Sequence, residues 1–216
     1  MLRLCSVLVL LVLPTLTWAD LRGVVRVIDA DTVDVGKIRV RLHAIDAPEQ
    51  DQLCQTDQGA DFACGAWATA RVVEAFEGRR ATCDHVDRDR YGRVVARCSM
   101  QGVDMGRHIV REGWAFAARA YGLDYDLDEK VAYVAGRGLH AFQLQSPTQF
   151  LQARAKGLVP PHPSCAIKGN ISDNGRVFHM PGQRFYQQTE IHEASGERWF
   201  CSEAAALRAG WRAASY

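Results

Sequence analysis

The stretch LRGVVRVIDADTVDVGKIRVRLHAI, residues 21–45, decides the fold of this chain. Its branched apolar residues recur with a period near two, which is typical of strands with one buried face. Asp29 to Asp31 and Gly36-Lys37 interrupt the alternation with residues that favour turns. The stretch therefore predicts consecutive strands joined by short turns.

The apolar spacing changes after residue 45. The sequence predicts a helix over 66–76, a hairpin over 81–99, and helices over 103–112 and 124–135. A glycine follows each predicted helix within two residues, where glycine favours helix termination. Strands first and helices later predict a small closed sheet with helices packed on it, a β-barrel of the α+β class.

The segment Gly157 to Ser164 separates this part from the C-terminal residues. Its prolines prevent regular structure. We therefore predict a main domain over 20–156, a linker over 157–164, and a small accessory domain over 165–216 with cysteines of its own.

Residues 1–19 have the features of a secretory signal peptide. Arg3 gives the positive start, Leu8 to Leu13 the apolar run, and Thr17-Trp18-Ala19 the residues before a cleavage site. The apolar run is too short to cross a membrane as a helix. We expect cleavage after Ala19 and an exported product, periplasmic or secreted, that is monomeric and has no membrane anchor.

Cleavage there would leave six of the seven cysteines, an even number that predicts disulfides in an exported chain. A hairpin without a bulge, centred on Arg90-Tyr91, places Cys83 opposite Cys98 within bridging distance. By elimination, Cys54 pairs with Cys64. The remaining two cysteines lie in the accessory domain.

Net charge does not indicate a partner. The whole chain has 26 Lys+Arg against 25 Asp+Glu, and loss of Arg3 with the signal peptide leaves 25 of each. Any site for phosphate must therefore be local.

Three short polar stretches contain the residues that phosphodiester hydrolysis requires. They are Asp29-Ala30-Asp31-Thr32, Arg41 with Asp46-Ala47-Pro48-Glu49, and Asp89-Arg90-Tyr91-Gly92-Arg93. Each stretch is ordinary when taken alone. Asp-x-Asp at a turn usually binds backbone amides, a proline after Asp46 simply ends a strand, and the third stretch could be a polar hairpin tip. Together they supply carboxylates for a hard cation, one spare carboxylate and two arginines. A metal and guanidinium groups stabilise charge on phosphate oxygens, and a carboxylate prepares the water.

The order and spacing of these stretches resemble the thermonuclease, or staphylococcal-type nuclease, family. The family pattern is Val-Ile-Asp-x-Asp-Thr, an arginine five residues before Asp-x-Pro-Glu, and Asp-x-Tyr-Gly-Arg; the resemblance covers roughly residues 21–155. It implies a five-stranded OB-fold barrel with helices, in agreement with the strand and helix pattern. It also implies a calcium-dependent nuclease acting on DNA or RNA, with endonuclease or exonuclease action left open.

The resemblance implies a calcium site. Asp31 and Asp46 are the expected carboxylate ligands, joined by the backbone carbonyl of Ala47. Asp29 is expected to act behind them or through a water. Family members often have threonine in place of Ala47, but the metal needs only the carbonyl.

The resemblance also implies the catalytic groups. Glu49 is expected to orient or deprotonate the attacking water, and Arg41 and Arg93 to clamp the phosphate. Of two family tyrosines near the nucleotide, Tyr121 keeps one position and Arg119 occupies the other. Two alternatives stay open for Arg119: a nucleic-acid contact by stacking or phosphate binding, and a solvent-facing side chain.

The accessory domain resembles a small module that recurs in bacterial proteins, sometimes beside nuclease domains. Its aromatic residues are expected to form its own core, because about fifty residues need every apolar group for burial. Cys165 and Cys201 with His179 could bind zinc, but no fourth ligand is evident. The prediction is therefore a disulfide between Cys165 and Cys201.

Two alternatives belong to other classes of protein. One is a noncatalytic nucleic-acid-binding OB-fold protein, which the loss of Arg41, Glu49 or Arg93 would have supported. The other is a cell-surface interaction protein whose activity lies in the accessory domain. All three residues are present, so the sequence favours an exported calcium-dependent nuclease.

Overall fold

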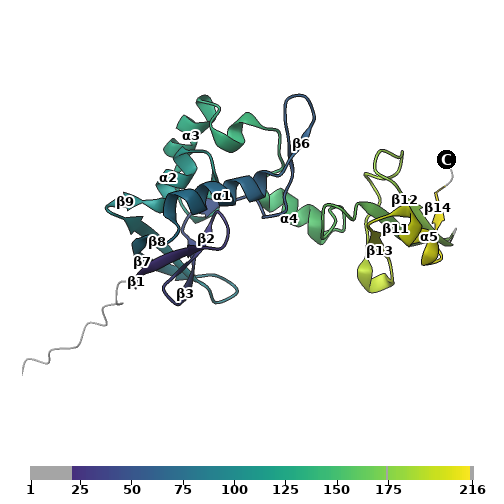
Figure 1. Cartoon of the computed structure of the whole chain (residues 1–216), viewed down its shortest axis with the longest axis horizontal. Helices are drawn as coiled ribbons and strands as arrows, with labels where there is room; N and C mark the ends of the chain where they lie inside the picture. The colour runs from purple at the N-terminus through teal and green to yellow at the C-terminus, as the bar shows by residue number, and fades with distance from the viewer. Residues whose placement is uncertain (1–20, 174, 215–216) are drawn as a thin grey trace, which may run out of the picture.

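The computed structural model describes residues 21–173 and 175–214, so the predicted signal peptide lies outside the described residues. Two folded parts, each with its own sheet, lie at either end of helix α4 (Pro147–Ala155) (Figure 1). No helix in the described ranges is long and apolar enough to cross a membrane.

The first part is built on a closed β-barrel. Its strands are β1 (Leu21–Val27), β2 (Thr32–Val35), β3 (Ile38–Leu42), β7 (Arg80–Arg88) and β8 (Val94–Met100). They run in the order β3-β2-β1-β7-β8, and a parallel pairing of β3 with β8 closes the sheet. The short β9 (Val103–Asp104) pairs with β8 outside the closed set. The predicted OB-fold barrel is confirmed.

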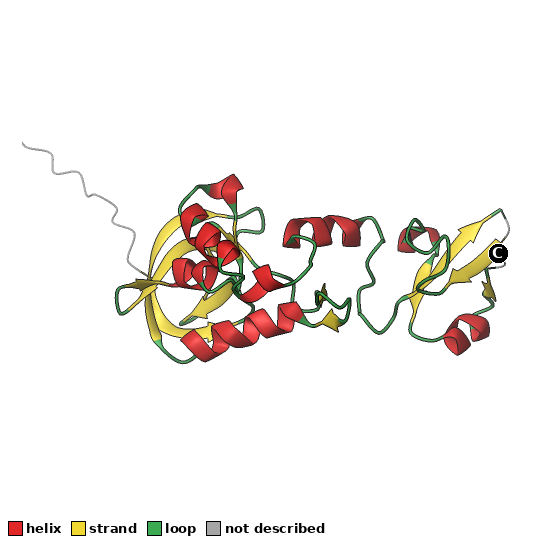
Figure 2. Cartoon of the chain, turned by 90° about the horizontal axis from the view of Figure 1, so that it is seen from above, coloured by secondary structure: helices red, strands yellow, loops and turns green. Residues whose placement is uncertain are grey.

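Three helices cover this barrel. Val25 and Val40 inside it are at most 1% exposed. Helix α1 (Cys64–Phe76) packs on β1, α2 (Met105–Arg111) on β8, and α3 (Asp126–Val134) on α2 (Figure 2). These helices match the predicted ones to within two residues at each end. The barrel and its helices form a rigid frame for the turns and loops between them.

Short elements complete the first part. They are β4 (Ile45–Asp46), β5 (Cys54–Gln55), β6 (Asp61–Phe62), β10 (Phe116–Ala117) and the 3-10 helices η1 (Arg119–Tyr121) and η2 (Gly138–Ala141). Strand β4 pairs with β10, so Asp46 lies opposite Phe116. A disulfide joins Cys54 to Cys64, as predicted.

The β7–β8 hairpin differs in detail from the prediction. Cys83 lies opposite Cys98 and a disulfide joins them, as predicted. The register between the strands nevertheless shifts by one residue at Val86, which forms a bulge. The loop consequently has three residues between Asp89 and Arg93, whose backbones are hydrogen-bonded. The prediction of an unbulged two-residue turn is therefore wrong.

Helix α4 is not among the predicted elements, although the sequence contains signals for its start. The Ser146 side chain accepts from the N–H of Gln149, and the Gln149 side chain accepts from the N–H of Ser146. Pro147 follows the cap, where a missing N–H costs nothing. The helix buries Pro147 and Phe150, too few positions to give a clear apolar period.

The second part is a small sheet with one α-helix. Strands β13 (Arg198–Phe200), β11 (Ile167–Ser172), β12 (Gly175–His179) and β14 (Arg212–Ala213) lie in that order, beside α5 (Glu203–Arg208) and the 3-10 helix η3 (Glu193–Ser195). Its apolar cluster consists of Ile167, Phe178, Phe200, Ala206 and Trp211. The aromatic residues therefore form a core of their own, as predicted.

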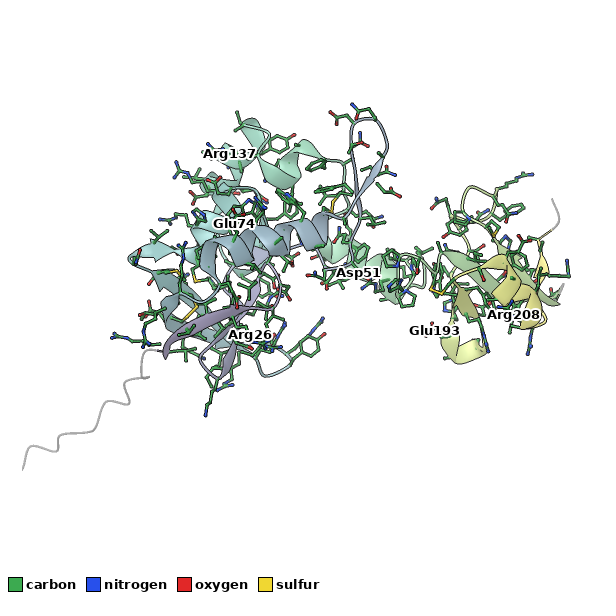
Figure 3. All side chains as sticks on the ribbon, viewed as in Figure 1. Arg26, Asp51, Glu74, Arg137, Glu193 and Arg208 are labelled. Carbon is green, nitrogen blue, oxygen red and sulfur yellow. A yellow bond between two sulfur atoms is a disulfide. The ribbon has the colours of Figure 1, made fainter. Side chains whose placement is uncertain are left out.

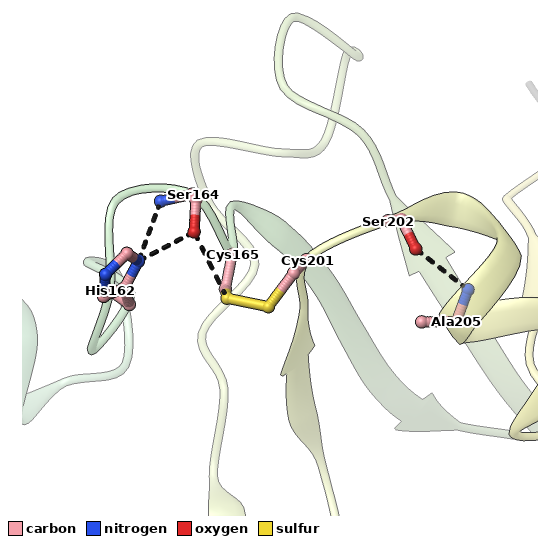
Figure 4. Close-up of a disulfide and its surroundings, with 6 residues drawn as sticks. All are labelled: His162, Ser164, Cys165, Cys201, Ser202 and Ala205. Atoms are coloured by element: carbon pink, nitrogen blue, oxygen red, sulfur yellow. Dashed lines mark hydrogen bonds between the residues drawn. A yellow bond between two sulfur atoms is a disulfide. The ribbon is translucent and has the colours of Figure 1, made fainter.

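A disulfide between Cys165 and Cys201 ties the start of β11 to the end of β13, as predicted (Figure 4). Both sulfurs are used in this bond, and His179 Nε2 lies 3.1 Å from Asn170 Oδ1. The described residues of the predicted linker contain no helix or strand. The carbonyl of Gly157 accepts a hydrogen bond from the N–H of Ile191, so the linker contacts the second part from its first residue.

Candidate active site

The turn between β1 and β2 carries Asp29 and Asp31. Asp29 Oδ1 accepts a hydrogen bond from the N–H of Asp31 at 3.0 Å, the Asx turn that aspartate favours. The carbonyl of Thr32 accepts from the N–H groups of Ile28 and Asp29, which closes the turn. Asp31 is 5% exposed, so protein groups rather than water must donate most of the hydrogen bonds that its carboxylate oxygens accept.

Donors from three segments converge on the Asp31 carboxylate. Oδ1 accepts from Arg41 Nη1 at 3.0 Å and from Thr32 Oγ1 at 2.9 Å. Oδ2 accepts from the N–H of Ala47 at 3.1 Å. Because Arg41 belongs to β3 and Ala47 to the loop after β4, one carboxylate joins the β1–β2 turn, a barrel strand and that loop.

Arg41 links Asp31 to Asp46. Its Nη2 donates to Asp46 Oδ1 at 3.2 Å, and its side chain is 26% exposed, which leaves part of the guanidinium open to solvent. Burial disfavours the charged guanidinium, but the carboxylates of Asp31 and Asp46 outweigh burial and raise the pKa of Arg41. The structure thus brings together the two expected metal ligands and one expected phosphate clamp.

Carboxylates outnumber cations at this site. Burial, followed by the charge of Asp31, raises the pKa of Asp29 to about 7. The same two causes in the same order raise the pKa of Asp46 and the pKa of Glu49. Burial and a neighbouring negative charge both disfavour the ionised carboxylates, and a cation bound among them would favour that form.

An all-oxygen donor set with excess negative charge fits calcium, a hard cation with flexible coordination. Asp31 and Asp46 are the carboxylates that fit best, because Arg41 already holds them on either side of one guanidinium. Within the described ranges, no three Asp, Glu, His or Cys side chains form a complete metal-binding group. A cation here would therefore also need backbone or water oxygens, such as the carbonyl of Ala47.

Glu49 lies on a loop that packs against the first turn of α1. Its carbonyl accepts from the N–H of Gln52 at 2.8 Å, and its N–H donates to Gln52 Oε1 at 3.3 Å. A Cβ on Gly65 would lie 1.7 Å from the carbonyl oxygen of Glu49, so the helix can approach only with glycine there. The Cys54–Cys64 disulfide anchors the same loop beside this contact.

Arg93 lies at the end of the β7–β8 loop, where Asp89 holds it. Arg93 Nε donates to Asp89 Oδ2 at 2.6 Å, and Asp89 Oδ1 accepts from the N–H groups of Arg93 and Tyr91. Val95 lies opposite Arg41 in the β3–β8 pairing. Arg93 itself comes one residue before β8 begins at Val94, so Asp89 rather than the sheet fixes its side chain.

The two residues expected near nucleic acid differ in their surroundings. Tyr121 is 71% exposed and close enough to Arg41 for the two groups to interact electrostatically. Arg119 instead forms ion pairs with Asp126, at 2.6 Å, and with Glu129 of α3. These ion pairs favour a structural role for Arg119, a third possibility beside the two that the sequence left open.

Sequence reasoning missed three residues that contact the site: Gln52, Gly65 and Thr148. Thr148 Oγ1 donates to Asp46 Oδ2 at 3.2 Å across a sequence separation of 102, which no local pattern reveals. Gln52 is 1% exposed and looks like any loop glutamine in the sequence. Gly65 comes directly before the helix predicted over 66–76, where glycine is common, so the sequence did not single it out.

A closed OB-fold barrel whose turns and strands gather carboxylates around Arg41 is suited to phosphodiesters. The chain matches the family model described as staphylococcal nuclease homologue over residues 39–139. That stretch includes Arg41, Glu49 and Arg93, whereas Asp31 precedes it. This chain belongs to the staphylococcal nuclease homologue family, as its motifs implied.

Three relatives illustrate the range of the similarity. The succinoglycan biosynthesis protein ExoI of Rhizobium meliloti (strain 1021) is 35% identical over 162 residues, 74% of this chain and 73% of that protein. An uncharacterized endonuclease of Escherichia coli is 35% identical over 112 residues, 49% of this chain and 67% of that protein. A micrococcal nuclease of Shigella flexneri is 35% identical over 139 residues, 58% of this chain and 74% of that protein.

Gly65→Ala should reduce phosphodiester hydrolysis without unfolding the protein. The added methyl would displace the backbone of Glu49, the expected base, and a displacement of about 1 Å at such a group can cost about 100-fold in rate. Circular dichroism and initial rates on an oligonucleotide measure the two effects. Ala70→Gly, at an exposed position of the same helix, is the control and should lose about 1 kcal/mol of stability but keep its rate. An unchanged rate in Gly65→Ala would contradict the placement of Glu49.

Proposed function

We propose that this protein is an exported, calcium-dependent nuclease that hydrolyses phosphodiester bonds of DNA or RNA. Family membership supports a nuclease, and two of the relatives are named as an endonuclease and a micrococcal nuclease. The single observation that carries the proposal is the arrangement of Arg41 between Asp31 and Asp46. It unites a candidate cation site and a phosphate-binding group in one contact.

Asp31, Asp46 and the carbonyl of Ala47 would hold the calcium ion. Bound calcium supplies Lewis-acid stabilisation of the charge that develops on phosphate oxygens. The N–H of Ala47 donates to Asp31, which orients both the carboxylate and the peptide whose carbonyl is expected to bind. Asp29 fixes the turn through its bond to the N–H of Asp31 and would act behind the ligands.

The remaining side chains have distinct roles. Glu49, with its backbone fixed by Gln52 and Gly65, would accept a proton from the attacking water. Arg41 and Arg93 would donate to the phosphate oxygens, because guanidinium groups bind phosphate in a bidentate manner. Each arginine would exchange part of its present carboxylate contact for the phosphate.

Nucleic acid would extend from this centre across exposed groups. Tyr121 offers an exposed ring on which a base could stack. Arg119 is less available, because Asp126 and Glu129 hold its guanidinium. We therefore place nucleic-acid contact chiefly at Tyr121. Arg119, in the same short helix, would support Tyr121 by tying that helix to α3.

Export and a monomeric state are part of the proposal. Three disulfides in the described residues suit an oxidising compartment, periplasmic or extracellular. Residues 165–216, with their own core, would act as an accessory domain for binding or targeting. A noncatalytic OB-fold protein that only binds nucleic acid is the rival function.

Cleavage of plasmid DNA should require calcium. Magnesium demands tighter octahedral geometry and keeps its waters, so it should substitute poorly at a site of this kind. The measurement compares cleavage in calcium, in EGTA with magnesium, and after calcium is restored. Full cleavage in EGTA with magnesium would refute calcium dependence, and no cleavage under any condition would favour the noncatalytic rival.

Arg93→Lys and Glu49→Gln should each lower kcat by about 100-fold or more in a folded protein. Lysine keeps the charge of Arg93 but loses the guanidinium fork, and glutamine cannot take a proton from water. Steady-state kinetics on an oligonucleotide, with circular dichroism as the test of folding, measure the effects. Arg90→Lys, on the same loop, is the matched control and should retain its kcat. Normal turnover in either site variant would show that its role is misassigned.

A further inference from the structure

We propose that the segment from Gln145 to Ala155, which contains α4, positions the loop of residues 46–52, with Thr148 as the positioning residue for Asp46. The inference rests on the proposed function, because that loop carries Asp46 and Glu49. The segment follows the stretch matched by the family model, which ends at residue 139.

Thr148 fixes the second oxygen of Asp46. Its Oγ1 donates to Oδ2 at 3.2 Å, while Arg41 Nη2 donates to Oδ1 at 3.2 Å. Strand β4 has two residues, so the sheet alone gives Asp46 little orientation. With one donor on each oxygen, the carboxylate plane is set from both sides.

Arg154, six residues after Thr148 on the same helix, fixes the loop at a second point. Its Nη2 lies 2.7 Å from Asp51 Oδ2, and each side chain is about 30% exposed. The Arg154 guanidinium stacks on the ring of Phe150, 4.6 Å from its centroid, which limits its freedom. Asp51 lies where the first part of the protein meets α4 (Figure 3).

Gln52 connects the same segment to the backbone of Glu49. Its Nε2 donates to the carbonyl of Gln145 at 2.8 Å, and its Oε1 accepts from the N–H of Glu49 at 3.3 Å. The side chain is buried, so both bonds form away from water, where a polar group left without a partner is costly.

The contacts made by Thr148, Arg154 and Gln145 lie on both sides of Glu49 in the sequence. They reach Asp46 before it, and Asp51 and Gln52 after it. The capping box at Ser146 and Gln149 fixes the start of the helix that presents them. A helix held in this way would limit movement of the loop that carries a metal ligand and the base.

The test uses full-length Thr148→Val, Thr148→Ser and Gln152→Ala, with calcium binding by titration calorimetry and kcat and KM on an oligonucleotide. We expect Thr148→Val to weaken calcium binding about 10-fold and to lower kcat, as loss of a partner behind a metal ligand does. Thr148→Ser keeps the hydroxyl and should restore both. Gln152→Ala, an exposed position on the same helix, should match the unchanged protein.

Arg154→Gln gives a second, independent measurement. It should lower kcat with calcium affinity unchanged, because Arg154 contacts the loop beside Glu49 rather than Asp46. Unchanged calcium affinity and kcat in Thr148→Val, or a Thr148→Ser variant as impaired as Thr148→Val, would overturn the proposal while the proposed function stands. An unchanged protein that neither binds calcium nor cleaves would instead overturn the proposed function, and this inference with it.

Discussion

The buried carboxylate of Asp31 is the interaction on which the site depends. Arg41, Thr32 and the N–H of Ala47 donate to it from three segments of the chain. Breaking a buried charged pair costs roughly 3–5 kcal/mol, so the β1–β2 turn, strand β3 and the loop after β4 are constrained together. The same contact that completes this part of the barrel also places Asp46 beside Arg41.

Backbone contacts, more than charge pairing, place the other groups. Glu49 is located by the close approach of Gly65 and by two hydrogen bonds to Gln52. Arg93 is the exception, because an ion pair and a backbone hydrogen bond to Asp89 hold it at the end of the β7–β8 loop. A site of this kind needs the whole domain to be folded, because its parts come from strands, helix α1 and the segment before α4. Such rigid placement is what catalysis by positioned groups requires.

The sequence predicted the features that local patterns encode. Alternating valines gave the barrel strands, and the distance of Arg41 from Asp46 matched the family motif. The pairing of Cys83 with Cys98 followed from the hairpin register. The bulge at Val86 could not be predicted, because the alternation of apolar residues does not show where one strand has an extra residue. Thr148 was also beyond prediction, since its contact with Asp46 spans 102 residues and its helix has a weak apolar period.

Titration calorimetry of calcium into Asp31→Asn, with kcat measured on the same preparation, tests the central claim most directly. Asparagine keeps the size of the side chain but removes the charge that Arg41 and the cation share. Asp34→Asn is the control, because Asp34 pairs with Arg26 and Arg39 on the outer surface of the same strand pair. We predict that folded Asp31→Asn binds no measurable calcium and loses nearly all turnover, whereas the control retains both. Calcium affinity and turnover equal to those of the unchanged protein would contradict the account.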